Sequence, residues 1–252
     1  MTFRELKDML DERVARYQTR DFIEADPISI PHRFSRKEDI EIAGILAATI
    51  SWGNRKAIVE KAGQMLDLLC NQPYDFVMNA SARDLEMLSH FVYRTFQQDD
   101  LPGFVRALRA IYKNGGLERI FTPRQGEGVK DCISMFRAQM LPHLSQRTHK
   151  HIADVDRGAA AKRINMFLRW MVRPAEGGVD FGLWKGLSPA QLYLPLDVHS
   201  GRQGRLLGIL TRKQNDWKAV EEITAFLRKL NPYDPVSYDF ALFGLGIFEG
   251  MK

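Results

Sequence analysis

One apolar stretch constrains the fold of this 252-residue chain more than any other feature. Residues 42–50 read Ile-Ala-Gly-Ile-Leu-Ala-Ala-Thr-Ile, almost without polar side chains. The preceding Ser-Arg-Lys-Glu at residues 35–38 fits a capping box, so we predict a helix over residues 37–52. A helix that is apolar on nearly every side is buried on nearly every side. This segment is therefore predicted to be the core helix of one lobe.

Apolar residues recur at helical spacing along almost the whole chain. Thr2 and Glu5 fit another capping box, and further helices are predicted around residues 55–69, 101–114, 129–141, 159–172 and 217–230. We find no strand-like alternation and no internal repeat. The sequence predicts an all-α protein built as one compact unit over residues 1–252. Its central helical lobe spans about 35–140, and its second lobe spans about 1–34 plus 145–252, with a cleft between them.

Composition excludes several classes of protein. No apolar run is long enough to span a bilayer, and the N-terminus lacks the apolar core of a signal peptide, so we expect a cytoplasmic protein with no membrane partner. The two cysteines, Cys70 and Cys132, are too few for a zinc or iron–sulfur site, and we expect no metal and no cofactor. The formal charge of +5 favours a polyanionic partner, although many proteins that bind no nucleic acid are this basic.

A single lysine stands out at the start of the helix predicted over residues 159–172. Lys162 falls in the first turn, after Gly158 and three alanines, so little side-chain bulk surrounds it. First-turn N–H groups attract anions such as phosphate and lower the pKa of a nearby ammonium. Because the neutral amine is a nucleophile, Lys162 is a candidate catalytic residue. Arg169 and Arg173 share its polar face, which is either a solvated basic surface or a phosphate contact.

A candidate partner for this lysine lies in Leu-Pro-Leu-Asp-Val-His-Ser at residues 194–200, ahead of a helix predicted over residues 198–207. Asp197 is placed as the N-cap, where an aspartate contributes about 1 kcal/mol by accepting hydrogen bonds from the helix end. The same rigid, ionised carboxylate is also suited to face Lys162 and to stabilise a developing sugar cation. The structural and functional interpretations of Asp197 are compatible.

These residues resemble motifs of the helix-hairpin-helix DNA glycosylase superfamily, which includes endonuclease III and the archaeal 8-oxoguanine glycosylases. Residues 196–208, Leu-Asp-Val-His-Ser-Gly-Arg-Gln-Gly-Arg-Leu-Leu-Gly, look like the superfamily segment that carries its essential aspartate. Residues 161–167, Ala-Lys-Arg-Ile-Asn-Met-Phe, sit where the superfamily has its lysine helix, and residues 239–244 are similar to its last helix. The whole chain also looks like a family of uncharacterised bacterial proteins related to this superfamily, through residues 162–173 and 195–199.

The chain departs from that pattern in three ways. The glycine-rich hairpin of endonuclease III is reduced here to Val-Asp-Arg-Gly-Ala-Ala-Ala at residues 155–161. The gap from Lys162 to Asp197 is longer than in endonuclease III and closer to that of the archaeal 8-oxoguanine branch. The four-cysteine iron–sulfur loop is absent from the sequence.

The resemblance implies a glycosylase and abasic-site lyase that acts as a monomer on duplex DNA with a damaged, flipped base. Lys162 would form a Schiff base with the sugar, and Asp197 would assist. A non-catalytic DNA- or RNA-binding protein is the second interpretation, and a scaffold without a nucleic-acid role is the third. The residues expected to contact nucleic acid are Gly158, Arg163, Arg169, His199, Ser200, Gly201, Arg202 and Arg205. The candidates for the base pocket are His32, Trp52, Asn54 and Trp184, although a helix–helix corner is the simpler explanation of Trp52 and Asn54.

Overall fold

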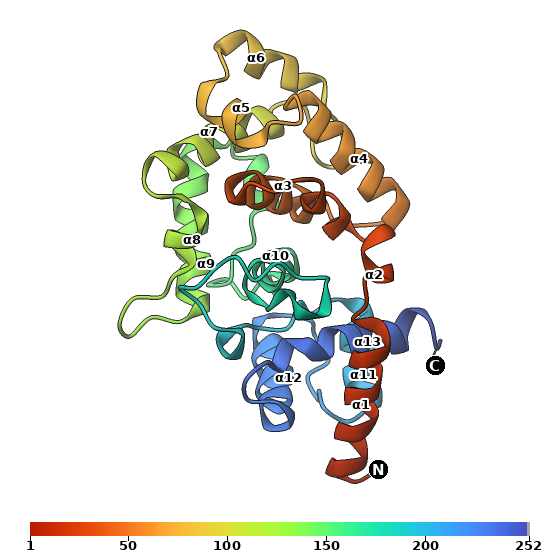
Figure 1. Ribbon diagram of the computed structural model, residues 1–252. Helices are drawn as coiled ribbons and strands as arrows, with labels where there is room; N and C mark the ends of the chain where they lie inside the picture. The colour runs from red at the N-terminus through yellow and green to blue at the C-terminus, as the bar shows by residue number, and fades with distance from the viewer. Residues whose placement is uncertain (251–252) are drawn as a thin grey trace. The chain divides into compact units, whose positions relative to one another are not determined.

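The computed structural model describes residues 1–250 and confirms that this part of the chain is all-helical (Figure 1). Two isolated β-bridges, Tyr93 with Phe96 and Ala159 with Asp216, are the only extended pairings among the described residues. Within residues 1–250, every helix is too short or too polar to cross a membrane. The absence of strand-like alternation in the sequence therefore predicted the fold class correctly.

The chain divides into two compact units, one of residues 23–153 and one of residues 1–22 together with 154 onward. The first unit contains α3 (Lys37–Thr49), α4 (Arg55–Leu68), α5 (Pro73–Asn79), α6 (Ala82–Met87), α7 (Asp100–Lys113), α8 (Gly116–Phe121) and α9 (Val129–Met140). The second unit contains α1 (Phe3–Tyr17), α10 (Lys162–Val172), α11 (Val198–Leu206), α12 (Trp217–Leu230) and α13 (Tyr238–Ile247). A short helix, α2 (Asp21–Glu24), spans the boundary. We refer to them as the α3 unit and the α10 unit.

The apolar helix predicted from the sequence is the core of the α3 unit. Every residue of α3 from Ile40 to Thr49 is buried, and α4, α5 and two short 3-10 helices, η1 (Pro27–Ser29) and η2 (Pro31–Arg33), pack against it. The predicted capping box at Ser35 is wrong. Arg36 is the N-cap and makes no side-chain capping bond, because a guanidinium has no acceptor for the helix N–H groups, and it pairs with Glu38 (Nε–Oε2 3.3 Å).

The α10 unit is built around α13, which packs against both α1 and α11 (Figure 1). A Cβ on Gly244 of α13 would lie 2.1 Å from the Tyr17 ring, so only glycine permits this approach to α1. The apolar face of α10 adds Phe167, Leu168 and Met171, which are fully buried. The α10 unit therefore carries on one packed core the two segments that the sequence analysis singled out.

Candidate functional site

Lys162 is the first residue of α10, three positions later than the predicted helix start. The preceding Ala161 adopts a left-handed conformation (φ 50°), and the helix has no side-chain cap. The helix cannot extend backward through such a residue, which explains the later start. Lys162 nevertheless lies in the first turn, as predicted, and its side chain is 31% exposed.

Asp197 is the N-cap of α11, as the sequence predicted. Its Oδ1 accepts hydrogen bonds from the backbone N–H groups of His199 and Ser200, both at 2.9 Å. Ser200 completes a capping box, because its Oγ accepts a hydrogen bond from the Asp197 N–H at 2.9 Å. Both capping hydrogen bonds are accepted by Oδ1, which leaves Oδ2 to contact another residue.

That partner is Lys162, whose Nζ lies 3.9 Å from Asp197 Oδ2. The two residues are 35 positions apart in the sequence (162 to 197) and come from different helices. Their side chains are 31% and 30% exposed, so solvent reaches the pair. An ion pair this long and this exposed adds little stability, since water screens it. The pair therefore contributes little to the stability of the fold.

Residues 215–217, where α12 begins, bond to the backbone at Asp197 and at Gly158, four residues before Lys162. The Asn215 Nδ2 donates a hydrogen bond to the Asp197 carbonyl at 2.8 Å, and the Trp217 N–H donates to the Gly158 carbonyl at 2.9 Å. Arg205 of α11 secures the same loop, because its guanidinium donates to the Asn215 Oδ1 at 2.7 Å. The turn before Lys162 and the turn that holds Asp197 are thus tied to neighbouring residues of one segment.

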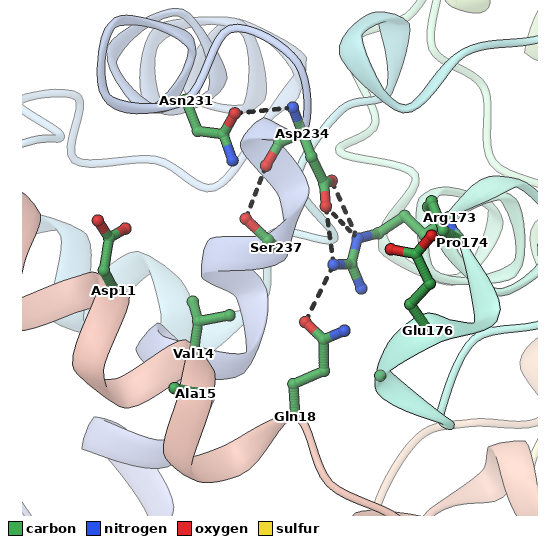
Figure 2. Close-up of a pocket in the computed structure, with 11 residues that line it drawn as sticks. Asp11, Val14, Ala15, Gln18, Arg173, Pro174, Glu176, Asn231, Asp234 and Ser237 are labelled. Atoms are coloured by element: carbon green, nitrogen blue, oxygen red, sulfur yellow. Dashed lines mark hydrogen bonds and ion pairs between the residues drawn. The ribbon is translucent and has the colours of Figure 1, made fainter.

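The prediction that Arg169 contacts phosphate is wrong, and so is a solvated basic face on α10. Arg169 and Arg173 are each 3% exposed and share the buried carboxylate of Asp180. Arg169 also pairs with Asp239, and Arg173 pairs with Asp234 (Nη2–Oδ2 2.8 Å). Figure 2 shows the Arg173 guanidinium held by Asp234 and Gln18 at the side of a cavity. Both arginines are buried because carboxylates from three other segments neutralise them.

Aspartate before proline, as at residues 234–235, is typical of a helix N-cap. Asp234 is the N-cap of a short 3-10 helix, η8 (Pro235–Ser237), which precedes α13, but its side chain makes no capping bond. Its carboxylate is instead engaged by the guanidinium of Arg173. Although burial lowers the pKa of Arg173, the hydrogen bond and charge of Asp234 outweigh burial and raise that pKa above its ordinary value.

The residues of α11 that were predicted to contact phosphate differ in their exposure to solvent. His199 and Arg202 are exposed on α11, whereas Ser200 and Gly201 are buried. The predicted phosphate role of Ser200 does not fit, because its hydroxyl is buried and bonded to Asp197. Gly201 serves packing instead, since a Cβ there would lie 2.7 Å from Asn215 Oδ1.

Three further residues predicted to contact phosphate, Arg205, Arg163 and Gly158, are bonded or partly buried within the protein. The Arg205 guanidinium bonds to backbone carbonyls of Arg212 and Lys213, each at 2.8 Å, which corrects its expected phosphate role. Arg163 is partly exposed, and burial lowers the pKa of its guanidinium to about 10. Gly158 is partly exposed in its turn (φ 89°), with its carbonyl bonded to Trp217.

The base-pocket candidates lie in different units. His32 and Asn54 are exposed in the α3 unit, where Asn54 caps α4 by accepting a hydrogen bond from the Ala57 N–H at 3.1 Å. Trp52 is partly exposed there and stacks on His151, with ring centroids 5.6 Å apart. Trp184 belongs to the α10 unit and is 2% exposed, packed edge-on against Phe167, so its predicted pocket role is wrong. That His32, Asn54 and Trp52 line one pocket together with Lys162 stays a prediction.

A cavity of about 380 Å³ lies elsewhere in the α10 unit (Figure 2). Its lining is largely polar, and Lys162 and Asp197 are not part of it. The lining residues are Asp11, Val14, Ala15, Gln18, Arg173, Pro174, Glu176, Gly177, Asn231, Asp234 and Ser237. Among residues 1–250, no three histidine, cysteine or acidic side chains are grouped closely enough to hold a metal ion.

Sequence reasoning missed Asn215, which bonds to the Asp197 carbonyl, and also Asp180 and Asp239, which neutralise the buried Arg169. One signal was available. Arg169 and Arg173 are spaced one turn apart on a helix whose other residues near them are Trp170, Met171 and Val172. Arginines among such bulky apolar neighbours are buried with carboxylate partners more readily than they are solvated. The sequence gave no indication of which carboxylates those would be.

Over residues 1–250 the fold and the site define an all-helical protein in which a lysine and a helix-capping aspartate lie together, both partly exposed to solvent. Comparison with known families places the chain in one of them. A family described as a protein of unknown function (DUF2400) matches residues 26–248, and the chain belongs to this family. The match includes both Lys162 and Asp197. No curated protein and no solved structure matches the chain.

Proposed function

We propose that the protein is a DNA base-excision enzyme, a glycosylase and abasic-site lyase that uses Lys162 as its nucleophile and Asp197 as its assisting carboxylate. The observation that carries the proposal is the 3.9 Å approach of Lys162 Nζ to Asp197 Oδ2 at a solvent-exposed position. The resemblance of residues 161–167 and 196–208 to the superfamily's lysine and aspartate segments supports it independently.

The chemistry follows from the two groups. The neutral Lys162 amine attacks C1′ of the sugar as the bond from C1′ to the base breaks, and the departing base takes up a proton. Asp197 stabilises the cationic character that develops on the sugar ring. The sugar ring then opens to a Schiff base with the lysine, and β-elimination breaks the 3′ phosphate bond. Because Asp197 Oδ1 is held by two backbone N–H groups, the carboxylate keeps a fixed direction throughout.

We assign the contacts with DNA phosphates to cationic residues on the segments that carry this pair. Arg157 is exposed in the turn of residues 155–158 that precedes α10, and Arg202 and Lys213 are exposed on α11 and on the loop that follows it. The first turn of α10 lacks a side-chain cap, so its N–H groups favour a phosphate. Binding that depends on such contacts weakens steeply with salt, because each one releases a counterion from the DNA.

Borohydride trapping tests the proposal. The protein is mixed with duplexes that carry an abasic site, 8-oxoguanine or an oxidised pyrimidine, and borohydride reduces any Schiff base to a stable adduct. We expect an adduct with the wild type, none with Lys162→Ala, and a reduction of at least about 100-fold with Asp197→Asn, the scale of a removed electrostatic stabiliser. Lys218→Ala, which removes an exposed lysine of α12, is the matched control and should trap normally. Trapping that persists in Lys162→Ala would reject the assignment.

A DNA- or RNA-binding protein without catalysis is the second candidate. The exposed positions of His199 and Arg202 favour it, because they suit phosphate binding whether or not Lys162 reacts. Salt-sensitive binding that Arg202→Ala weakens, with no adduct on any duplex, would select this function over the enzyme. An oligonucleotide that is not retained even at low salt would reject both.

A further inference from the structure

The cavity drawn in Figure 2 is separate from the Lys162–Asp197 pair. Lys162 is the first residue of α10, whereas Arg173, which lines the cavity, is the C-cap at the other end of the same helix. The eleven residues of α10 place about 16 Å between these two ends. The cavity volume of about 380 Å³ falls within the range of about 300–1,000 Å³ that small-molecule sites occupy, so the cavity is a candidate site of its own.

Three helices end at this cavity, and each contributes its C-cap residue to the lining. Gln18 is the C-cap of α1, Arg173 that of α10 and Asn231 that of α12. The last carbonyl groups of a helix lack partners within the helix, and the aligned peptide dipoles place about half a negative charge at this end. The backbone therefore favours a cation in the cavity before any side chain is considered.

The side chains of the lining add to this negative potential. Asp11, Glu176 and Asp234 are acidic, and Arg173 is the one basic residue of the lining within the described chain. Arg173 is 3% exposed and pairs with both Asp234 and the buried Asp180, so its charge is already neutralised. The cavity therefore has an excess of negative charge that its own lining does not offset.

The wall of the cavity is built around the Arg173 guanidinium. Gln18 Oε1 accepts a hydrogen bond from Arg173 Nη2 at 3.0 Å, and Asp234 Oδ1 accepts one from Arg173 Nε at 2.9 Å. A Cβ on Gly177 would lie 2.0 Å from Gln18 Nε2, so glycine leaves this amide in place. The protein thus already holds one cationic group here, which shows the kind of chemistry that the lining stabilises.

Two carboxylates on opposite sides of the cavity can take a further cation (Figure 2). Glu176 is exposed in a short 3-10 helix, η6 (Ala175–Gly177), and makes no hydrogen bond or ion pair with the described residues. Asp11 Oδ1 accepts a hydrogen bond from the Tyr238 hydroxyl at 2.7 Å, and Oδ2 pairs with Lys7. The side chains of that pair are 45% and 40% exposed, so water screens the pair and a ligand can replace the lysine.

The arrangement suits an extended organic cation better than a metal ion. Among the described residues, no three histidine, cysteine or acidic side chains are close enough to hold a metal ion together. A linear chain with an ammonium group at each end can instead reach Asp11 on one side and Glu176 on the other. Its methylene groups can lie against the apolar part of the lining, which Val14, Ala15 and Pro174 supply.

We propose that this cavity binds a linear aliphatic diamine or polyamine, one ammonium group of which pairs with Asp11 and another with Glu176. The Ser237 hydroxyl donates to the Asp234 carbonyl at 2.7 Å and keeps a lone pair that can accept a hydrogen bond from the ligand. The inference is independent of the proposed function, because the candidate catalytic pair does not line the cavity.

Isothermal titration calorimetry of the whole protein at low ionic strength tests the proposal, with 1,4-diaminobutane and spermidine as probes. The formal charge of the chain is +5, so the protein repels cations on average and saturable binding requires a local negative site. We expect one saturable site for each probe. An exposed ion pair contributes up to about fivefold in affinity, so 1-aminobutane, which can form only one, should bind about threefold to fivefold more weakly than 1,4-diaminobutane.

Two substitutions remove the proposed ion pairs one at a time and keep the size of the side chain. Glu176→Gln and Asp11→Asn should each weaken binding of 1,4-diaminobutane about threefold to fivefold, and the double variant about 10- to 25-fold, because separate contributions add. Glu12→Gln is the matched control, since Glu12 is the neighbour of Asp11 on α1, is 75% exposed and does not line the cavity. It should bind both probes as the wild type does.

The outcomes decide the proposal in either direction. It is overturned if the folded wild type shows no saturable binding of either diamine or polyamine. It is equally overturned if 1-aminobutane binds as tightly as 1,4-diaminobutane, or if Glu12→Gln weakens binding as much as Glu176→Gln, because both results indicate unspecific attraction. If Asp11→Asn does not fold, Glu176→Gln decides alone, since Glu176 is exposed and has no partner to lose. The titration contains no DNA, so its result and that of borohydride trapping are independent.

Discussion

The buried charges behind the candidate site predict a large effect of one isosteric substitution, Asp180→Asn. The Asp180 side chain is fully buried and is shared by Arg169 and Arg173, whose side chains are each 3% exposed. The substitution keeps the size of the side chain and removes its charge. Two guanidinium groups then remain buried with only Asp239 and Asp234 to neutralise them.

The magnitude follows from the degree of burial. Removing one partner of a buried ion pair costs about 3–5 kcal/mol, because the remaining charge stays out of water without its counter-ion. Asp239 and Asp234 still neutralise the arginines here, so we expect the lower end, about 3 kcal/mol. With a urea slope of about 2–3 kcal/mol per molar, the unfolding midpoint should fall by about 1 M.

Tryptophan fluorescence in urea suits the measurement, because Trp170, Trp184 and Trp217, three of the four tryptophans, belong to the α10 unit. Asp75→Asn is the matched control. It removes an ion pair with Arg36 in which the two side chains are 45% and 56% exposed, and it should leave the midpoint unchanged because water screens such pairs. A loss below about 1 kcal/mol for Asp180→Asn would refute the reasoning, since that is the range of an exposed pair.

Two further substitutions test separate parts of the structure. Asn215→Ala removes the hydrogen bond to the Asp197 carbonyl, so we expect the free energy of unfolding in urea to fall by about 1 kcal/mol and trapping to be slower than with the wild type. An unchanged trapping rate would mean that Asn215 does not position Asp197. In the α3 unit, burial alone would raise the pKa of Asp100, but hydrogen bonds from His151, Thr148 and other donors lower it to about 2. A carboxyl with a lowered pKa stabilises the fold above its ordinary pKa and loses that contribution as the pH falls toward 2, about 2 kcal/mol in all. Asp100→Asn should flatten the acid limb of a stability profile between pH 4 and 2, and a limb as steep as that of the wild type would contradict this account.

Local signals predicted much of the secondary structure. Thr2 and Asp197 cap their helices as expected, because a capping side chain bonds to N–H groups only a few residues away. The apolar segment at residues 42–50 is buried as expected, since a helix without a polar face has no side to expose to water. These features depend on contacts within one turn or on composition, and both can be read directly from the residues.

Long-range pairing was harder to predict. Arg169 and Arg173 lie on the polar face of α10, and periodicity treats a polar face as solvated. Their burial depends on Asp180, Asp234 and Asp239, which lie 7 to 70 residues away in the chain. The partner of Asp234 was missed for the same reason, because aspartate before proline indicates only a cap, whereas its carboxylate accepts hydrogen bonds from the guanidinium of Arg173.

The sequence by itself determined that the chain is helical, where most of its longer helices lie to within a few residues, and which lysine and aspartate were candidates for a site. Only the tertiary structure decided that Lys162 and Asp197 lie 3.9 Å apart, that residues 215 and 217 bond to the backbone of Asp197 and Gly158, and that Asp239 pairs with the buried Arg169. The physical reason is range. Helix propensity and capping act over one turn, whereas a site is assembled from residues that only the packing of separate helices brings together.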